Sequence, residues 1–364
     1  MNLNQELRNN LTTASELAQV FPDIKINDRI EEILEKYPIS IPQYYLSLID
    51  KNNLNDPIRR MSVPSFSEMD LDGSFDTSGE NDNTVIKGLQ HKYSQTVLLL
   101  STHCCAMYCR YCFRKRMVGA TSEEIAIDLD RIFDYIREHK EISNVLISGG
   151  DSFMLETDVI EKYLKNLSEI EHLDYIRFGT KVPVVFPDRI INDSQLLDLL
   201  KKYCNKKQIY ISTQFNHSNE ITPQSIKAIR LLQQAGLIIK NQTVLLKGIN
   251  DNPEVLGALL KNLTKIGIVP YYIFQCRPVS GVKNQFQVPL LKGYEIVEKA
   301  KGLQNGNGKC LRYAMSNTKG KVEIIGKGEK ENEMIFKFHQ AKNKENQSRI
   351  FTRILSENDC WVDD

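Results

Sequence analysis

The sequence has no long apolar run and almost no excess of charge. None of its apolar stretches approaches the roughly 20 residues that a membrane-spanning helix needs. Its N-terminal segment has no basic stretch followed by an apolar core, so it does not resemble a signal peptide. The formal net charge is +1, which gives no overall basic field that would favour nucleic acid. We therefore expect a cytoplasmic protein that binds neither a membrane nor nucleic acid.

Recognisable zinc motifs are also absent from the sequence. It has no second Cys-x2-Cys pair, and its six histidines are dispersed. Disulfides are rare in the cytoplasm, so they are disfavoured too. Nevertheless, four of the eight cysteines lie close together in the segment "STHCCAMYCRYCFRKRMVG" (101–119). Such a group of thiols can hold zinc, an iron–sulfur cluster or a disulfide, or can form a buried apolar turn, and the surrounding fold has to decide.

A repeated alternation of apolar strands and amphipathic helices begins at residue 96. The chain has 364 residues, 41% of them hydrophobic, which is enough for one large domain or two ordinary ones. The first helix predicted within this alternation, 122–139, carries its apolar residues on one face. Six strands are predicted, at 96–102, 144–151, 175–180, 208–215, 238–246 and 268–275. Six alternations with short connections predict a parallel α/β sheet with right-handed crossovers.

Two regions of different composition flank this alternation. Residues 1–90 predict helices followed by a linker, since the stretch 62–90 is polar and rich in Gly, Ser and Asp. Residues 91–300 form the predicted α/β core. Residues 301–364 show short alternating apolar runs separated by glycines, which predicts an α+β appendage whose strands are antiparallel.

Polar or glycine-rich clusters follow the predicted strands. The cysteine segment comes directly after the first strand, and "SGGD" comes after the second. The third, fourth and sixth strands are followed by "GT", "QFNH" and "QCRP". In parallel barrels the carboxyl ends of the strands gather on one face, which carries the chemistry. We therefore expect the functional site at this face.

The cysteine spacing suits an iron–sulfur cluster. The thiolates of Cys105, Cys109 and Cys112 come from one short loop and can ligate three irons of a [4Fe–4S] cluster, which leaves the fourth iron open. Four basic residues between positions 110 and 116 would lower nearby thiol pKa values and offset the cluster's charge. Cys104 adjoins the motif, and we expect its side chain to point away as core filler. A buried cysteine-rich turn is the alternative.

These features resemble the radical S-adenosylmethionine (SAM) superfamily, and the wider sequence resembles the lysine 2,3-aminomutase family. The similarity runs from residue 38 to about 298. The stretches that carry it are "PQYYLSLIDKNNLNDPIRR", "CAMYCRYCFRKR", "VLISGGD", "KVPVVFPDRI", "TQFNHSNEIT", "NQTVLLKGIND", "PYYIFQC" and "QVPLLKGYEIVE". The resemblance implies a partial (βα)6 TIM-like barrel. It also implies that SAM binds the open iron and is cleaved by one electron to methionine and a 5′-deoxyadenosyl radical.

The resemblance assigns further residues to SAM. Gly149 and Gly150 would let the backbone approach the SAM amino group, and Asp151 would give that turn an acceptor. The family also contacts SAM at strand ends, where this chain has Gln214, Asn216 and Gln242. The family commonly has histidine at the place of Gln214, so that contact is expected with altered geometry. A small redox protein such as flavodoxin or ferredoxin would supply the electron, and a homo-oligomer is possible.

The chain departs from the family at the pyridoxal phosphate (PLP) site. The family forms a Schiff base through a lysine after a glycine run, and here Lys309 follows two glycines in "LQNGNGKCLRYAMSN", a segment shorter by about three residues. Lys92 matches one phosphate-binding residue, whereas Thr96 replaces an arginine at the other. We therefore expect a radical SAM reaction without PLP. The alternative is a PLP-dependent 2,3-aminomutase that uses Lys309.

The substrate is expected to be a small anionic molecule. In the lysine-specific aminomutases an aspartate after the sixth strand pairs with the substrate ammonium group, and here Arg277 takes its place in "QCRP". Arg114 matches the family position that binds the substrate α-carboxylate. Two arginines in one pocket repel a lysine substrate and favour a dicarboxylic amino acid such as glutamate, or another anion.

Overall fold

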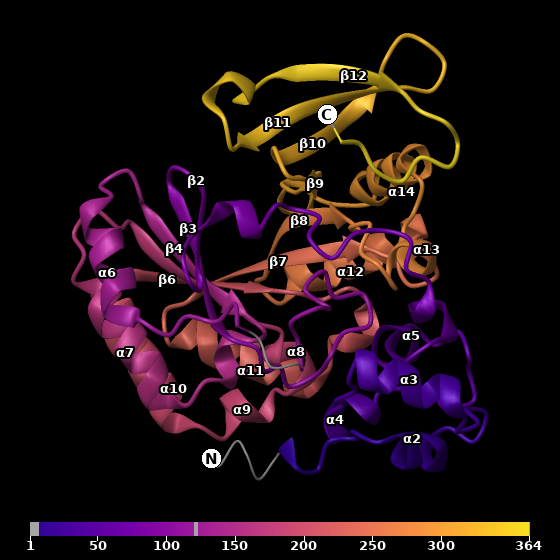
Figure 1. Cartoon of the computed structure of the whole chain (residues 1–364), viewed down its shortest axis with the longest axis horizontal. Coiled ribbons are helices and arrows are strands. Elements are labelled where there is room, and N and C mark those ends of the chain that lie inside the picture. Colours follow the sequence, from indigo (N-terminus) through magenta and orange to yellow (C-terminus); the bar gives the residue numbers. More distant parts are fainter. Residues whose placement is uncertain (1–6, 120–122, 364) are drawn as a thin grey trace.

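Six parallel strands form the centre of the computed structural model, which describes residues 7–119 and 123–363 (Figure 1). They pair in chain order, each parallel to the next. Their bounds are β3 Thr96–Thr102, β4 Asn144–Gly149, β5 Tyr175–Gly179, β6 Gln208–Thr213, β7 Ile238–Leu245 and β8 Val269–Gln275. The partial (βα)6 TIM-like barrel expected from the sequence is thereby confirmed.

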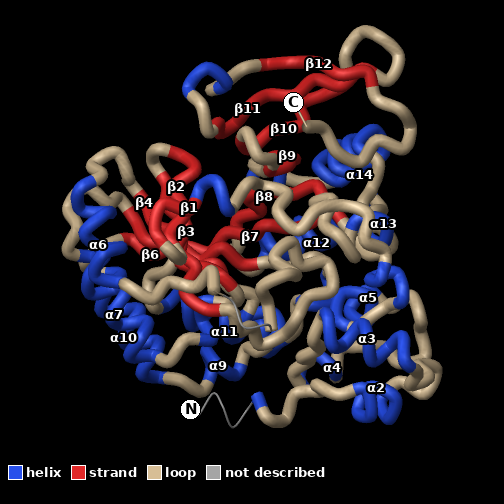
Figure 2. Tube along the Cα trace, in the orientation of Figure 1, coloured by secondary structure: helices blue, strands red, loops and turns tan. Residues whose placement is uncertain are grey.

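Helices cover the outer face of these strands (Figure 2). The longer ones are α6 Leu129–Glu138, α7 Thr157–Ser168, α10 Ser194–Cys204, α11 Pro223–Gln234 and α12 Pro253–Lys265, and the short helices α8 Val182–Val185 and α9 Asp188–Ile191 lie between β5 and α10. On α6 the residues Ile132, Phe133 and Ile136 are fully buried, as the helical spacing predicts. The helix expected over 122–139 begins only at α6, because the side chain of Asp128 caps it by accepting from Arg131 N. Position 122 lies outside the described residues.

The N-terminal part is more ordered than a helical region with a linker. Its helices are α2 Ala14–Val20, α3 Asp28–Lys36, α4 Gln43–Leu46 and α5 Pro57–Ser62. The stretch 62–90, expected to be a linker, contains two short 3-10 helices, Phe66–Met69 and Asn81–Asn83. It also contributes β1 Thr84–Ile86 and the start of β2 Leu89–Tyr93, and this hairpin pairs antiparallel with β3. The hairpin thus forms one edge of the sheet.

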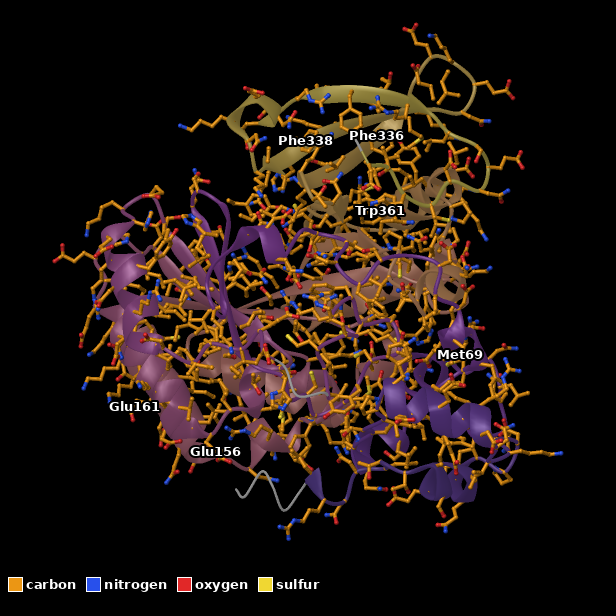
Figure 3. All side chains as sticks on the ribbon, viewed as in Figure 1. Met69, Glu156, Glu161, Phe336, Phe338 and Trp361 are labelled. Carbon is orange, nitrogen blue, oxygen red and sulfur yellow. The ribbon has the colours of Figure 1, made fainter. Side chains whose placement is uncertain are left out.

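The C-terminal part continues the same sheet. After the helices α13 Lys283–Phe286 and α14 Leu290–Gly302, strand β9 Arg312–Ser316 pairs parallel with β8. This strand departs from the antiparallel arrangement that we expected, because the intervening helices give the crossover length that a parallel pair requires. Strands β10 Gly320–Lys327, β11 Glu333–Ala341 and β12 Ile350–Ile354 are antiparallel as expected. Phe336 and Phe338 of β11 are fully buried within this layer (Figure 3).

No helix in the described parts of the chain is both long enough and apolar enough to cross a membrane.

Candidate active site

A cavity of about 420 Å³ lies inside the partial barrel. Residues at the carboxyl ends of the strands line it, among them Gly149 of β4, Gly179 of β5 and Thr213 of β6. Part of β10 and β11 also lines it, through Lys321 and Gln340. The expectation that the polar strand ends meet at one site therefore holds, and the C-terminal strands add a further wall.

Three cysteines face this cavity. Cys105, Cys109 and Cys112 are partly buried and line it together, whereas Cys104 is exposed and does not. The expectation that Cys104 is core filler is therefore wrong. Its carbonyl accepts from Asp151 N at 2.8 Å, so the backbone of Cys104 is held by the glycine turn although the residue is exposed.

The thiols have the number that a [4Fe–4S] cluster with one open iron requires, and all three line the same cavity. Among the described residues none of the three is in a disulfide, and all reach one enclosed space. Burial raises the pKa of Cys105 well above its ordinary value and that of Cys112 to about 11. Arg114 and Lys115 act to lower the pKa of Cys112, but burial outweighs them, so the expected net lowering does not occur at these two thiols. Iron binding deprotonates a coordinating thiol outright, so the donor set still fits the cluster.

Two buried carboxylates pair with the basic residues of the cysteine loop. Glu68 contacts both Arg110 and Lys115, and Glu80 contacts both Arg114 and Arg116. The ion pairs of Glu80 are 2.8 and 2.6 Å long. Burial alone would raise the pKa of Glu80, but the two guanidinium groups hold it at about 2. Glu68 and Glu80 therefore offset two of the four positive charges of the basic run.

These carboxylates were missed from the sequence. They lie 42 and 34 residues before Arg110 and Arg114, in a stretch that looked like a solvated linker. The sequence near Glu68 contains one local pattern that indicates structure: Ser65 and Glu68 form a capping box, with Glu68 at the third position of a 3-10 helix.

The glycine turn packs directly against the cysteine loop. A Cβ on Gly149, whose φ is +120°, would lie 2.4 Å from the carbonyl oxygen of Thr102. A Cβ on Gly150 would lie 2.3 Å from the carbonyl oxygen of Cys104. Both glycines line the cavity, so they permit this close approach and leave the backbone open to a ligand.

Asp151 fixes the end of the neighbouring strand. Its carboxylate accepts from Thr180 Oγ1 at 2.5 Å, from Lys181 N at 2.6 Å and from Phe153 N at 3.0 Å. Burial raises the pKa of Asp151. Since Asp151 lines the cavity as well, it couples the shape of the glycine turn to the end of β5.

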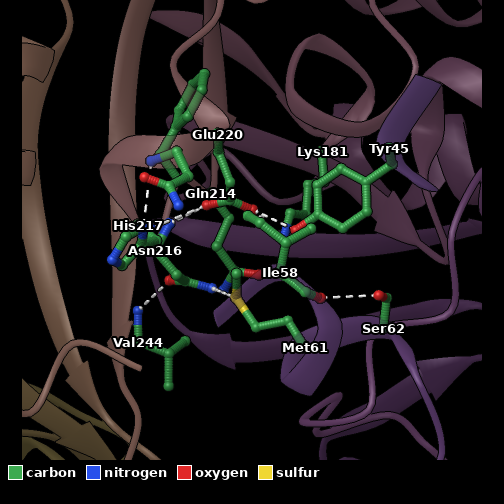
Figure 4. Close-up of polar contacts among 12 residues, drawn as sticks. Tyr45, Ile58, Met61, Ser62, Lys181, Gln214, Asn216, His217, Glu220 and Val244 are labelled. Carbon is green, nitrogen blue, oxygen red and sulfur yellow. Dashed lines mark hydrogen bonds and ion pairs between the residues drawn. The ribbon is translucent and has the colours of Figure 1, made fainter. Parts of the chain in front are cut away.

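The three predicted strand-end amides separate into two groups. Gln214 and Gln242 line the cavity, whereas Asn216 is fully buried behind it. Asn216 Nδ2 donates to the Tyr111 hydroxyl at 2.7 Å. Figure 4 shows its other contact, in which Oδ1 accepts from Val244 N at 2.8 Å. Asn216 thus positions the cysteine loop, to which Tyr111 belongs.

A buried ion pair supports the same loop. Lys181 lies 3.0 Å from Glu220 and donates to the Tyr111 hydroxyl at 2.8 Å. Glu220 also accepts from the Tyr45 hydroxyl at 2.7 Å (Figure 4). Lys181 and Tyr111 line the cavity. Sequence reasoning did not single out either residue: Tyr111 lies between two of the motif cysteines but is not a cluster ligand, and Lys181 follows β5 without a charged pattern around it.

The two predicted substrate arginines both reach the cavity, with different partners. Arg114 Nε and Nη2 contact Glu80, while its Nη1 lies 3.5 Å from Ser148 Oγ and from the Gly149 carbonyl. Arg277 lies over the Phe113 ring at 4.2 Å, and its buried Nη1 has no hydrogen-bond partner in the described residues. Arg277 is therefore the more available of the two.

The candidate PLP lysine lies elsewhere. Lys309 is exposed and is not among the residues that line the cavity. The structure therefore gives no fit for a PLP group held by Lys309 and facing the cysteines.

Comparison with known proteins defines the class. A model of the "Radical SAM superfamily" matches residues 99–259, which include the three cavity-facing cysteines and the glycine turn. A "Putative L-lysine 2,3-aminomutase" of Aquifex aeolicus is 40% identical over 92% of this chain and 89% of its own length. The "L-lysine 2,3-aminomutase" of Clostridium subterminale is 38% identical over 83% and 72%. The chain is thus a radical SAM enzyme, and it belongs to the lysine 2,3-aminomutase family.

Two further comparisons complete these findings. The "Glutamate 2,3-aminomutase" of Clostridioides difficile is 37% identical over 84% of this chain and 72% of its own length. A solved radical SAM methyltransferase from Sphaerobacter thermophilus is 15% identical, covers 62% of this chain and 68% of its own, and has a TM-score of 0.40. At that score the likeness decides nothing about function.

Replacement of Asp151 by alanine should weaken SAM binding more than it disturbs the cluster. The change leaves three donors around the glycine turn without their acceptor, so we expect roughly tenfold weaker SAM binding. Two measurements on the anaerobically reconstituted variant check this: calorimetric titration with SAM and an assay of bound iron. Loss of iron together with SAM binding, or unchanged SAM affinity, would contradict it.

Proposed function

We propose that this radical SAM enzyme acts on a small, anionic, amino-acid-like substrate and does so without PLP. When bound, the [4Fe–4S] cluster and SAM supply reductive cleavage of SAM and a 5′-deoxyadenosyl radical that abstracts hydrogen from the substrate. Cys105, Cys109 and Cys112 would hold the cluster. The backbone at Gly149 and Gly150, with Gln214 and Gln242, would orient SAM. A small redox protein such as flavodoxin or ferredoxin would donate the electron.

The observation that carries the substrate proposal is the state of Arg277. Burial lowers its pKa to about 10, so the guanidinium stays charged at neutral pH. It lines the cavity, and no salt bridge or side-chain hydrogen bond of Arg277 is found within the described residues. A buried cation without a direct ion pair is costly, and a substrate carboxylate would offset that cost. The name of the glutamate 2,3-aminomutase relative is consistent with an acidic substrate.

A PLP-dependent aminomutase is less well supported. That reaction needs a lysine beside the substrate, and the exposed position of Lys309 outside the cavity does not provide it. A homo-oligomer is compatible with this proposal and is not required by it.

Wild-type protein should bind glutamate at least about tenfold more tightly than lysine, and Arg277→Asp should reverse this order. The reversal follows because an aspartate presents a negative charge to the substrate. Isothermal titration of both amino acids into SAM-bound, unreduced protein measures it. Arg137→Asp on α6 is the control, since Arg137 forms an exposed pair with Asp134 at 2.7 Å. A wild-type preference for lysine, or an unchanged order in Arg277→Asp, would overturn the pocket assignment.

A further inference from the structure

Two histidines and a glutamate meet outside the barrel cavity. His91 lies on β2, His139 ends α6 as its C-cap, and Glu141 follows two residues later. Each offers one possible ligand atom, and these three atoms lie within 4.8 Å of one another. None of the three residues lines the cavity. No zinc motif marks them in the sequence, because β3 and α6 separate the two histidines along the chain and only folding brings them together.

Backbone contacts hold the two segments together independently of these side chains. Gln95 lies in the turn between β2 and β3, just after the strand that carries His91. Its carbonyl accepts from Ser143 N at 3.1 Å. Since Ser143 comes two residues after Glu141, the loop between α6 and β4 is fixed against this turn. The possible ligands are therefore brought together before any metal binds.

The His91 ring has the hydrogen bonding of a metal-binding histidine. Its Nε2 lies 3.1 Å from the Ser94 carbonyl oxygen. Because a carbonyl only accepts, Nε2 carries the proton of the neutral ring, and Nδ1 offers a lone pair. Histidines that bind metals almost always donate their second ring nitrogen to such a partner. Nδ1 lies 2.9 Å from the Tyr135 hydroxyl, which can donate to it.

The second histidine and the carboxylate are already in contact. His139 Nδ1 lies 2.8 Å from Glu141 Oε1. The His139 ring stacks on the Tyr135 ring with the centroids 4.0 Å apart, and it meets the His91 ring edge-on at 5.7 Å. Tyr135 also meets His91 edge-on, at 5.8 Å, so this one ring packs against both imidazoles. A metal ion would take the place of the proton that His139 and Glu141 share.

We propose that His91, His139 and Glu141 form a binding site for a divalent transition metal, with Zn²⁺ as the ion that fits best. Two imidazoles and one carboxylate are an established donor set for zinc, and they leave a fourth position for water. Ligand atoms around tetrahedral zinc lie roughly 3.3 Å apart. Glu141 is exposed, so rotation of its side chain can bring the carboxylate to that distance.

The position of this site favours a structural role. A bound metal would cross-link β2, near the edge of the sheet, to the loop between α6 and β4. The site lies towards the start of β3, since Tyr93 of β2 pairs with Thr96, whereas the cysteine loop follows the end of β3. In parallel barrels the carboxyl-end face carries the chemistry and the amino-end face contributes stability. We therefore expect the metal to stabilise the fold and to leave the radical reaction unchanged.

Zinc titration into the cluster-containing protein tests the site. Anaerobically reconstituted protein is passed over a chelating resin, and SAM is added so that the open iron is covered. Wild type should then bind one Zn²⁺ per chain. His91→Gln and Glu141→Gln should each bind it about 100-fold or more weakly, because each removes one of three ligands. Equal binding by wild type and both variants would overturn the site.

Two further variants are matched controls. His172→Gln removes another half-buried histidine, whose Nε2 lies 2.9 Å from the Ile136 carbonyl oxygen. Glu138→Gln removes another exposed carboxylate, at the end of α6. Neither residue belongs to the group of three, so both variants should bind zinc as wild type does. A loss in these controls as large as that in Glu141→Gln would overturn the assignment of the ligands.

X-ray absorption at the zinc edge identifies the ligand atoms directly. Histidine and carboxylate ligands lie about 2.0–2.2 Å from zinc, whereas thiolates lie at about 2.3 Å. We expect the shorter shell alone. A sulfur shell, or loss of iron when zinc is added, would show that zinc occupies the cysteines instead, and would overturn the proposal.

Thermal unfolding measures the structural role. Zinc should raise the unfolding midpoint of wild type and leave that of His91→Gln unchanged. A wild-type midpoint that zinc does not raise would overturn this role, as would release of 5′-deoxyadenosine that changes with zinc. The inference goes beyond the proposed function and does not rest on it. If zinc-free wild type released no 5′-deoxyadenosine, that result would count against the radical function and would leave the zinc measurements unaffected.

Discussion

Replacing any one of Cys105, Cys109 and Cys112 by alanine should abolish the cluster and all SAM cleavage. Each thiol faces the same cavity, so the loss of one leaves an iron without its protein ligand. We expect iron and sulfide to fall to background in each variant, with no 5′-deoxyadenosine released after reduction. We would measure the cluster by iron and sulfide assays and by the electron paramagnetic resonance signal of the reduced protein. Chromatography of the nucleoside products measures SAM cleavage.

The neighbouring cysteine provides the control. Cys104 precedes Cys105 in the chain, yet its thiol is exposed and lies outside the cavity. Cys104→Ala should therefore keep the iron content and the rate of 5′-deoxyadenosine release of wild type. A cluster that survives in Cys105→Ala and is lost in Cys104→Ala would show that the ligands are misassigned.

The central fold follows from the sequence because its signals are local. Apolar runs such as 96–102 and the helical spacing of Ile132 and Ile136 specify buried strands and one-sided helices without knowledge of their neighbours. The β1–β2 hairpin was missed because both strands are short and partly exposed. Only their place beside β3 shows that these residues are strands. The direction of β9 likewise depends on its partner β8.

The residues of the site likewise fall into those that local sequence predicted and those that only the fold brings together. Cys105, Cys109 and Cys112 come from one loop, so their spacing alone predicted a common ligand. The partners of the basic run could not be found, since Glu80 becomes a buried counter-charge only when the polar stretch 62–90 folds over the cysteine loop. Lys321 likewise has no pattern in the sequence, because only the fold of the C-terminal strands brings it to the cavity.

Glu68, which the sequence did not indicate as a site residue, forms a buried group of charges with two basic residues of the cysteine loop. Its carboxylate is completely buried and contacts the Arg110 guanidinium and the Lys115 ammonium group. The Arg110 side chain also donates to the carbonyls of Pro38 at 2.9 Å and Tyr37 at 3.2 Å. This group of charges ties the cysteine loop to the N-terminal helical part. Removing the carboxylate would leave two buried cations without a counter-charge.

Glu68→Gln should therefore lower the free energy of unfolding by about 3–5 kcal/mol, as expected when one partner of a buried ion pair is lost. Burial pushes the pKa of Glu68 up, but Arg110 and Lys115 outweigh it and hold that pKa below the usual value. The carboxylate's contribution is thus fully present above the pKa of the unfolded carboxyl group and is lost as pH falls through the folded value. The difference between Glu68→Gln and wild type should accordingly shrink in acid.

Urea unfolding at pH 7 and at lower pH measures both effects. The matched control is Glu161→Gln, because Glu161 lies on the outer surface of α7 and forms an exposed pair with Lys202 at 2.8 Å (Figure 3). Exposed pairs contribute about 0–1 kcal/mol, so this variant should stay close to wild type. If Glu68→Gln cost no more than Glu161→Gln, the buried charges around the cysteine loop would not need Glu68. The loop would then have to be held by its backbone contacts, such as Arg110 N to Met61 O at 2.9 Å.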